Sequence, residues 1–168
     1  MFDPEVLDHA ARVIAANRAA GTRIVTAESC TGGLVTAALT EIAGSSDVVD
    51  RGFVTYSNEA KMDALGVHSD LIATFGAVSV AVAWAMAQGA LKRSDADTAV
   101  AITGIAGPGG GSAQKPVGTV VFAVARRGDP DCKIADTKNY GDLGRSEIRR
   151  QAVLCALELL MPRDAPAP

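Results

Sequence analysis

Residues 22–33 read Thr-Arg-Ile-Val-Thr-Ala-Glu-Ser-Cys-Thr-Gly-Gly, and the class of fold is best inferred from this segment. The first six residues, with Ile24, Val25 and Ala27 alongside β-favouring threonines, predict a short buried strand. A helix is expected from about Gly32 to Glu41, so residues 28–33 form a strand-to-helix turn. In open α/β sheets, ligands bind beyond the carboxyl ends of strands. The turn is therefore the first candidate for a functional site.

Helices and strands alternate on both sides of this turn. Upstream, Asp3 and Pro4 predict the start of a helix that Gly21 ends. The other expected elements are strands at 52–56 and 98–102, a strand pair at 117–125 and 133–137 joined through 128–130, and helices at 59–65 capped by Asn58, at 68–74, at 80–93 capped by Ser79, and after Ser146. This mixture predicts an α/β fold, a three-layer α/β/α sandwich with a mixed sheet.

The composition favours one compact domain. The chain has 168 residues, and 48% of them are hydrophobic. We place the domain at residues 1–162 and expect a disordered tail at 163–168. The net charge of −3 gives no electrostatic reason to expect binding to nucleic acid or to a membrane surface, and Arg145, Arg149 and Arg150, which sit among acids, are expected to form one solvated helix face. No apolar run approaches the roughly 18 residues that span a bilayer, and no signal peptide is evident. We therefore expect a soluble, cytoplasmic protein.

The cysteines and histidines do not form a metal-binding pattern. Cys30, Cys132 and Cys155 are isolated from one another, and neither His9 nor His68 lies near a cysteine. The sequence therefore predicts no disulfide framework and no metal site. No organic cofactor is expected either. Because the apolar segments exceed what a small, aromatic-poor domain must bury, a homodimer is a further prediction.

The turn at residues 28–33 has the groups needed to hold an anion or a developing oxyanion. Unpaired N–H groups begin the following helix, and Gly32 and Gly33 let a ligand approach the backbone. Ser29 can be a nucleophile here, or it can simply cap the helix. Cys30 is a rival nucleophile, because a helix start lowers the pKa of a thiol. The alternative is that Cys30 is a buried structural residue.

A serine nucleophile needs a base, and Lys61 is the candidate. His9 and His68 are expected at the surface. A lysine can act as a base when it is neutral. Lowering its pKa from about 10.4 to about 7 costs roughly 4 kcal/mol, which burial in an apolar pocket can supply. The alternative is an ordinary solvated lysine.

A glycine-rich loop, residues 103–116, follows the strand expected at 98–102. The loop matches neither the Walker A pattern nor Gly-x-Gly-x-x-Gly. It can be a flexible surface loop or a backbone cradle for a phosphate. Its position after an apolar strand favours contact with a ligand.

Several of these segments together resemble the CinA C-terminal domain family. They are residues 26–33 (TAESCTGG), 52–58 (GFVTYSN) with Lys61, 76–79 (GAVS), and the stretch 101–118 that includes GIAGP at 104–108, with KPVGT at 115–119. The resemblance covers about residues 5–160. Within the family, the chain is most similar to the stand-alone form. It implies an amidohydrolase that converts nicotinamide mononucleotide to nicotinate mononucleotide and ammonia.

The resemblance also implies roles for individual residues. Ser29 would be the nucleophile, Lys61 the general base, and Tyr56 would orient Lys61. The residues expected to contact substrate are Glu28, Cys30, Thr31, Gly32, Gly33, Thr103, Gly104, Gly107, Gly109 and Arg145. The family often reads Gly-Asp-Arg where this chain has Gly-Asp-Leu-Gly-Arg at 141–145, so the match of Arg145 stays open. Two alternatives also stay open: a non-catalytic nucleotide-binding or regulatory module of the competence and damage-inducible type, and an amidase for another pyridine nucleotide.

Overall fold

The computed structural model describes residues 2–163 and shows one domain built on a five-stranded mixed sheet. The strands are β1 (Ile24–Glu28), β2 (Val49–Val54), β3 (Thr98–Gly104), β4 (Thr119–Arg126) and β5 (Asp129–Asn139). Their order in the sheet is β2-β1-β3-β4-β5. β2, β1 and β3 are parallel, whereas β4 and β5 are antiparallel to their neighbours.

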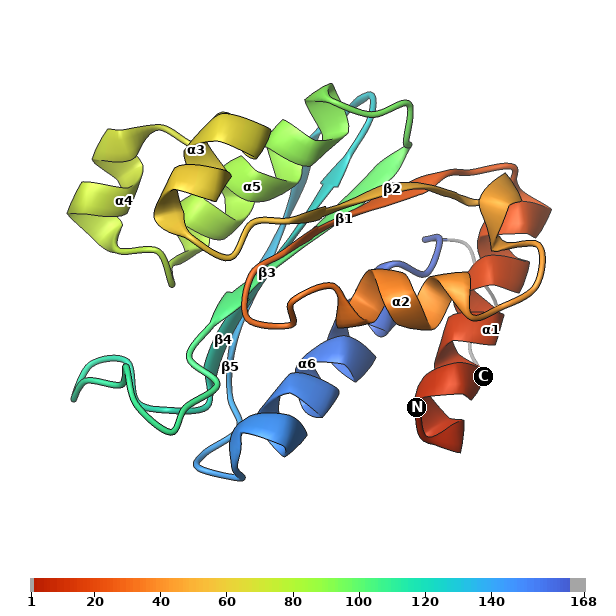
Figure 1. The fold of residues 1–168 in the computed structure, drawn as a ribbon. Helices are drawn as coiled ribbons and strands as arrows, with labels where there is room; N and C mark the ends of the chain where they lie inside the picture. Colours follow the sequence, from red (N-terminus) through yellow and green to blue (C-terminus); the bar gives the residue numbers. More distant parts are fainter. Residues whose placement is uncertain (1, 164–168) are drawn as a thin grey trace.

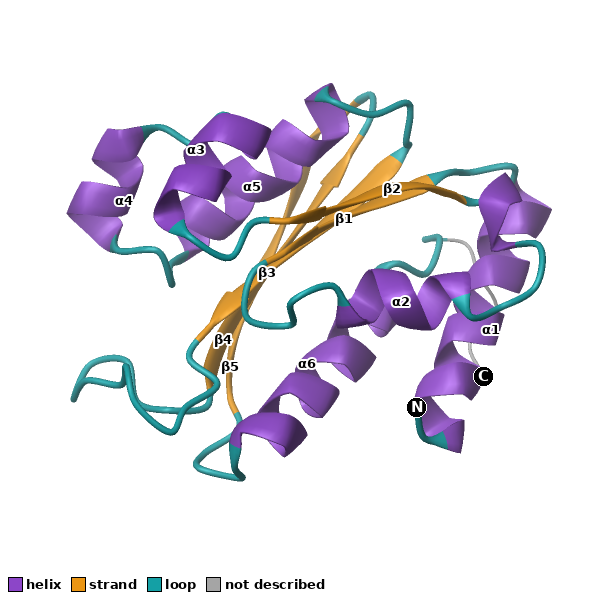
Figure 2. Ribbon diagram, viewed as in Figure 1, coloured by secondary structure: helices purple, strands orange, loops and turns teal. Residues whose placement is uncertain are grey.

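Helices cover both faces of the sheet, which confirms the predicted three-layer sandwich (Figures 1 and 2). The helices are α1 (Pro4–Ala20), α2 (Leu34–Thr40), α3 (Asn58–Leu65), α4 (Ser69–Phe75), α5 (Val80–Lys92) and α6 (Arg145–Leu159), and a 3₁₀ turn covers Ser45–Asp47. α1, α2 and α6 lie on one face, and α3, α4 and α5 lie on the other (Figure 1).

The two faces of the sheet carry side chains of different size. Phe122, Val124 and Ile102 point toward α1 and α6, whereas the alternate alanines of β3 and β4 point toward α5. Small side chains let α5 approach closely, as its many alanines predicted. Gly89 lets α5 approach the neighbouring helix α3 as well, because a Cβ there would lie 2.0 Å from the carbonyl oxygen of Leu65.

Most helix ends follow local sequence signals. The carboxylate of Asp3 accepts the N–H of Val6 at 3.1 Å, and Gly21 ends α1 with φ +65°. Two predicted caps are wrong. Ser57, rather than Asn58, caps α3, because its hydroxyl accepts the N–H of Ala60 at 3.0 Å.

The final helix also begins differently from the prediction. Ser146 lies inside α6, which begins at Arg145 with Gly144 as its cap. The hydroxyl at 146 is therefore too late to accept the first free N–H groups of the helix. Gly144 has φ +82°, a conformation that glycine adopts without strain, so the backbone alone makes this entry.

The edges of the sheet differ most from the predicted boundaries. β2 begins at Val49, three residues earlier than expected, because this edge strand is half exposed and lacks a buried apolar run. β5 begins at Asp129, so residues 129 and 130 belong to the strand rather than to the turn. Apart from Arg163, the tail predicted at 163–168 lies outside the described residues. Within residues 2–163, no helix has the length and apolar character needed to cross a membrane.

Candidate active site

The candidate site lies at the carboxyl ends of the parallel strands. β1 pairs with β2 on one side and with β3 on the other. The connection from β1 to β2 therefore runs to one side of β1, and the chain later returns to β3 on its other side. Such a reversal opens a crevice beyond the strand ends. A cavity of about 240 Å³ lies there, lined by Ser29, Cys30, Tyr56, Asn58, Lys61, Ala77, Val78, Thr103, Gly104, Ala106 and Arg145.

Ser29 and Lys61 are in direct contact at the base of this cavity. Lys61 Nζ lies 2.9 Å from Ser29 Oγ. Ser29 follows β1, and Lys61 lies on the first turns of α3, which follows β2. Because β1 and β2 are parallel neighbours, both residues reach the same edge of the sheet. Ser29 is 8% exposed and Lys61 only 1% exposed, so bulk water is largely excluded from the pair.

Burial makes the charged form of Lys61 unfavourable. Loss of hydration lowers the pKa of this amine from its ordinary 10.5, while the more distant Cys30 and Glu59 oppose the shift. Among residues 2–163, no carboxylate forms an ion pair with Nζ. Its other partners are the carbonyl oxygens of Thr55 at 2.9 Å and Ser57 at 3.4 Å. The amine is therefore held by neutral groups only.

The turn after β1 is organised by a buried carboxylate. Glu28 is fully buried and accepts the N–H groups of Gly33, Val35 and Thr36 and the hydroxyl of Thr36. It therefore satisfies the start of α2 and does not line the cavity. The substrate contact predicted for Glu28 has no counterpart in this geometry, because its oxygens are already occupied.

The glycines of the turn shape the backbone rather than line the cavity. Gly32 and Gly33 have φ of +61° and +94°, which residues with a Cβ rarely adopt. The N–H of Gly32 donates to Ser29 O at 3.0 Å, and the N–H of Gly33 is bound to Glu28. In the part of the chain that the structure describes, the N–H groups of Cys30 and Thr31 donate no hydrogen bond.

Cys30 is a buried neighbour of the nucleophile candidate rather than a reactive thiol. Burial raises the pKa of its thiol to about 12, and the charge of Glu28 adds to the shift. The lowered pKa that a helix start would give is therefore not found, since loss of hydration outweighs the backbone dipoles. Thr31 is also fully buried.

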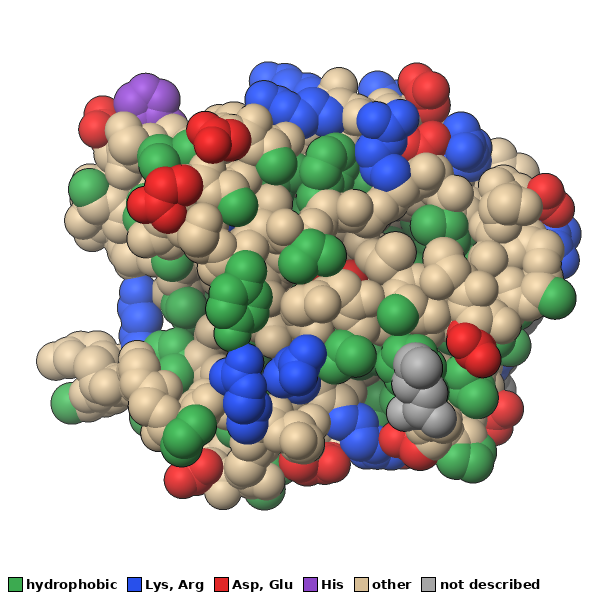
Figure 3. Space-filling model, in the orientation of Figure 1, with side chains coloured by type: hydrophobic (Ala, Val, Ile, Leu, Met, Phe, Trp, Pro, Cys, Tyr) green, Lys and Arg blue, Asp and Glu red, His purple; other side chains and the backbone are tan. Residues whose placement is uncertain are grey.

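Tyr56 contacts Arg145 rather than Lys61. The guanidinium of Arg145 donates to Tyr56 Oη at 2.8 Å and to Gly107 O at 3.0 Å. Tyr56 is 60% exposed at the mouth of the cavity. Figure 3 shows basic side chains gathered on this face over the first half of α6. The arginine at 145 therefore reaches the site despite its altered local sequence.

The glycine-rich loop contributes its first residues to the cavity. Thr103 and Gly104 line it, and the hydroxyl of Thr103 donates to Ala77 O at 2.9 Å. Gly107 reaches it only through the carbonyl bound to Arg145. Gly109 is exposed and does not line it. The loop beyond residue 107 projects from the body of the domain (Figure 1).

Sequence reasoning missed several residues around the site. Asn58, Ala77, Val78 and Ala106 line the cavity; they lie in the segments that carry the family resemblance, but the sequence assigned no site role to them. Arg149 contacts the turn at Cys30 and Thr31, although its sequence suggested a solvated helix face. Arg149 follows Arg145 by four residues, so both arginines lie on one side of α6. This spacing is the sequence feature that could have predicted the position of Arg149 near the site.

Comparison with known proteins now identifies the family. Residues 7–163 match the family described as the CinA C-terminal domain. The chain belongs to this family. The nicotinamide-nucleotide amidohydrolase PncC of Escherichia coli K12 is 49% identical to this CinA domain over 165 residues, which are 95% of each chain.

Longer relatives and solved structures agree with this assignment. A CinA-like protein of Mycolicibacterium gilvum is 56% identical over 141 residues, and the present chain spans 33% of that protein's length. The competence/damage inducible protein CihA of Agrobacterium tumefaciens has a TM-score of 0.89 at 54% identity, covering 95% of this chain and 96% of that one. A CinA superfamily protein of Klebsiella pneumoniae has a TM-score of 0.86 at 39% identity, covering 92% and 94%.

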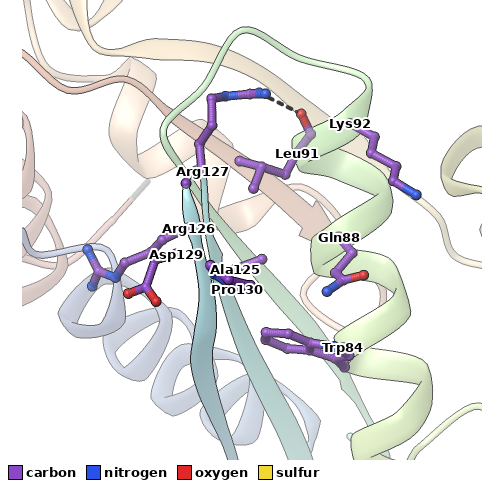
Figure 4. A pocket seen from close by; sticks show the side chains of 10 residues that line it. Trp84, Gln88, Leu91, Lys92, Ala125, Arg126, Arg127, Asp129 and Pro130 are labelled. Atoms are coloured by element: carbon purple, nitrogen blue, oxygen red, sulfur yellow. Dashed lines mark hydrogen bonds between the residues drawn. The ribbon is translucent and has the colours of Figure 1, made fainter.

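The CinA domain has a second, larger cavity that lacks comparable chemistry. It has a volume of about 410 Å³ and lies between α5 and the β4–β5 hairpin (Figure 4). Trp84, Leu91 and Pro130 give it an apolar wall. Arg127 is occupied by the carbonyl oxygens of Leu91, Ser94 and Ala96. No serine or cysteine lines this cavity, so the smaller cavity is the candidate for catalysis.

Metal ligands do not gather in the CinA domain. Over the described range 2–163, no cluster of three or more His, Cys, Asp or Glu side chains is arranged to hold an ion.

Proposed function

We propose that this CinA domain hydrolyses the carboxamide of nicotinamide mononucleotide, releasing nicotinate mononucleotide and ammonia. The observation that carries the proposal is the contact between Ser29 Oγ and Lys61 Nζ. This amine is buried, and its other hydrogen-bond partners are neutral carbonyl oxygens. The similarity to the E. coli nicotinamide-nucleotide amidohydrolase supports the choice of substrate. A purely binding module has no need of a nucleophile beside a buried base, which favours an enzyme over a regulatory domain.

The hydrogen bonds of Lys61 suit the role of a general base. A neutral amine has two N–H groups and one lone pair. When the two N–H groups donate to Thr55 O and Ser57 O, the lone pair faces Ser29 Oγ. The serine O–H then donates to Nζ. After proton transfer the ammonium has three N–H groups for the same three oxygens, so the lysine need not move.

Acylation follows from this arrangement. Ser29 Oγ attacks the carboxamide carbon as its proton passes to Lys61 Nζ, and a C–O bond forms. The protonated lysine then gives its proton to the amide nitrogen. The C–N bond breaks, and ammonia leaves. In the second half of the reaction, water gives a proton to Lys61 and attacks the acyl carbon. Ser29 takes that proton as the ester bond breaks.

The negative charge that develops on the carbonyl oxygen needs donors. The N–H groups of Cys30 and Thr31 are the free ones in the turn, since those of Gly32 and Gly33 are already bound. The residue after a nucleophile supplies such a donor in many hydrolases. We therefore assign the oxyanion contact to the N–H of Cys30, which lines the cavity, rather than to the glycines or to the fully buried Thr31.

The size of the cavity indicates how the nucleotide is oriented. Its volume of about 240 Å³ is below the roughly 300–1,000 Å³ of typical small-molecule sites. The pyridine carboxamide would enter the cavity, and the 5′-phosphate would stay at the mouth. Arg145 provides a planar cation there, held in place by Tyr56 and Gly107. Tyr56 thus acts by holding Arg145.

A substrate panel tests this assignment. Ammonia release should be fast from the mononucleotide and slow from the riboside and from free nicotinamide, because only the mononucleotide offers a phosphate to Arg145. In Arg145→Ala, KM for the mononucleotide should rise about 10- to 100-fold, whereas kinetics with the riboside should hardly change. No ammonia from any of the three substrates would favour the regulatory module.

The pH dependence of kcat tests the neutral lysine. Only the neutral amine accepts the proton of Ser29, so kcat should fall as pH drops through the pKa of Lys61. Burial lowers this pKa from 10.5, so the acid limb should be centred well below that value. The measurement is kcat for the mononucleotide from about pH 5 to pH 10. A profile without an acid limb would contradict the lysine base.

A further inference from the structure

Arg149 holds the turn that carries the proposed nucleophile. It lies on α6, and its Nε donates to Cys30 O at 3.1 Å while its Nη2 donates to Thr31 O at 2.9 Å. These contacts join positions 119 and 118 residues apart in the chain. Arg149 does not line the cavity, so its contact is with the enzyme backbone rather than with the space for the substrate.

The two contacts restrain the residue that follows the proposed nucleophile. Arg149 holds the carbonyl of the planar Cys30–Thr31 peptide unit and also the next carbonyl, that of Thr31. The backbone on the C-terminal side of Cys30 is therefore fixed relative to α6. Cys30 itself lines the cavity, so its N–H is held on the side of the substrate.

The other peptide units of the turn are also fixed. Ser29 O accepts the N–H of Gly32 at 3.0 Å, which sets the direction of the Cys30 N–H in the same peptide unit. Thr31 O accepts from Arg149 and from the N–H of Leu34 at 3.3 Å. All three carbonyls from 29 to 31 are therefore held, and the central one is held by Arg149.

We infer that Arg149 is a positioning residue for the oxyanion donor, the N–H of Cys30, through its hold on the carbonyl groups of Cys30 and Thr31. The inference rests on the proposed amidohydrolase function. A planar fork of two N–H groups fixes two neighbouring carbonyls together, which a single ammonium cannot do. The contribution is to kcat, because the oxyanion exists only in the transition state and the intermediate.

The next residue of the same helix provides a matched control. Arg150 pairs with Asp3, Glu5 and Glu147, away from the turn. Arg149→Ala should lower kcat for the mononucleotide about 30- to 100-fold and change KM less than about 3-fold. Arg150→Ala should keep wild-type kcat and KM, although it removes an equal charge from the same helix.

A second variant separates positioning from folding and from charge. Arg149→Lys keeps the charge but loses the fork, so its kcat should still be at least about 10-fold below wild type. Thermal melting shows whether each variant is folded, and Arg149→Lys decides the question if Arg149→Ala does not fold. Wild-type kcat in Arg149→Lys, or a raised KM with unchanged kcat in Arg149→Ala, would overturn the inference. A wild-type protein that releases no ammonia would instead reject the proposed function.

Discussion

Replacing Ser29 by alanine should lower kcat for ammonia release from nicotinamide mononucleotide by at least about 10⁴-fold. The hydroxyl is the only group 2.9 Å from the buried amine that can form the acyl bond, and alanine offers no oxygen. Binding should survive, because the cavity, the glycine-rich loop and Arg145 are unchanged. Calorimetric titration with the mononucleotide measures the binding, and a coupled ammonia assay measures the turnover.

Two controls make the Ser29 result specific. Ser94 is a similarly buried serine, 9% exposed against 8%, and it lies before β3 at the opposite end of the sheet. Ser94→Ala should keep wild-type kcat. Cys30→Ala should retain activity within about 10-fold, because the backbone N–H remains when the thiol is removed. Activity in Ser29→Ala together with its loss in Cys30→Ala would assign the nucleophile to the thiol.

Replacing Lys61 by methionine should abolish turnover while leaving the protein folded. We expect kcat to fall by at least about 10³-fold, because Lys61 Nζ is the group that contacts Ser29 Oγ and methionine cannot accept its proton. Two opposing effects act on stability. Methionine removes the cost of a buried amine, but it leaves Thr55 O and Ser57 O without their donor. The free energy of unfolding at neutral pH should therefore change by less than about 2 kcal/mol.

The sign of the pH effect on stability gives an independent check of Lys61. Because the folded-state pKa of Lys61 is lowered, the unfolded chain binds its proton more tightly between that pKa and 10.5. Wild-type stability relative to Lys61→Met should therefore rise as pH increases through this window. Urea unfolding of both proteins at several pH values measures the difference. A difference that does not depend on pH would contradict a lowered pKa.

Lys61→Arg provides the control for charge. A guanidinium stays protonated at all working pH values, so it cannot accept the proton of Ser29. This variant should be as inactive as Lys61→Met, although it keeps the positive charge. Substantial turnover in Lys61→Arg would show that the residue contributes charge rather than a base.

The sequence alone determined the layers of the fold and the residues at the centre of the site. The short apolar strand, the turn at 28–33 and the alternation of helices and strands predict the sandwich, because periodicity is a local property of the chain. The ordered motifs around Ser29, Tyr56 and Lys61 pointed to the family and to the dyad. Burial of the lysine was required by the chemistry, and the structure supplies it.

Only the tertiary structure decided how these residues meet. Ser29 and Lys61 are 32 residues apart, and the parallel pairing of β1 with β2 brings them to 2.9 Å. Glu28 satisfies the start of α2 and binds the N–H of Gly33, so the free N–H that lines the cavity belongs to Cys30 rather than to a glycine. Tyr56 meets Arg145, 89 residues away.

Arg149 illustrates why such contacts cannot be predicted from the sequence. Local pattern assigns it to a solvated helix face, because its neighbours are charged. Its partners are backbone carbonyls, which carry no sequence signal, and the packing of α6 across the start of α2 brings them together. Periodicity can say which face of a helix is apolar. Which backbone atoms a polar side chain reaches depends on the position of another element, and that position is set only when the layers pack.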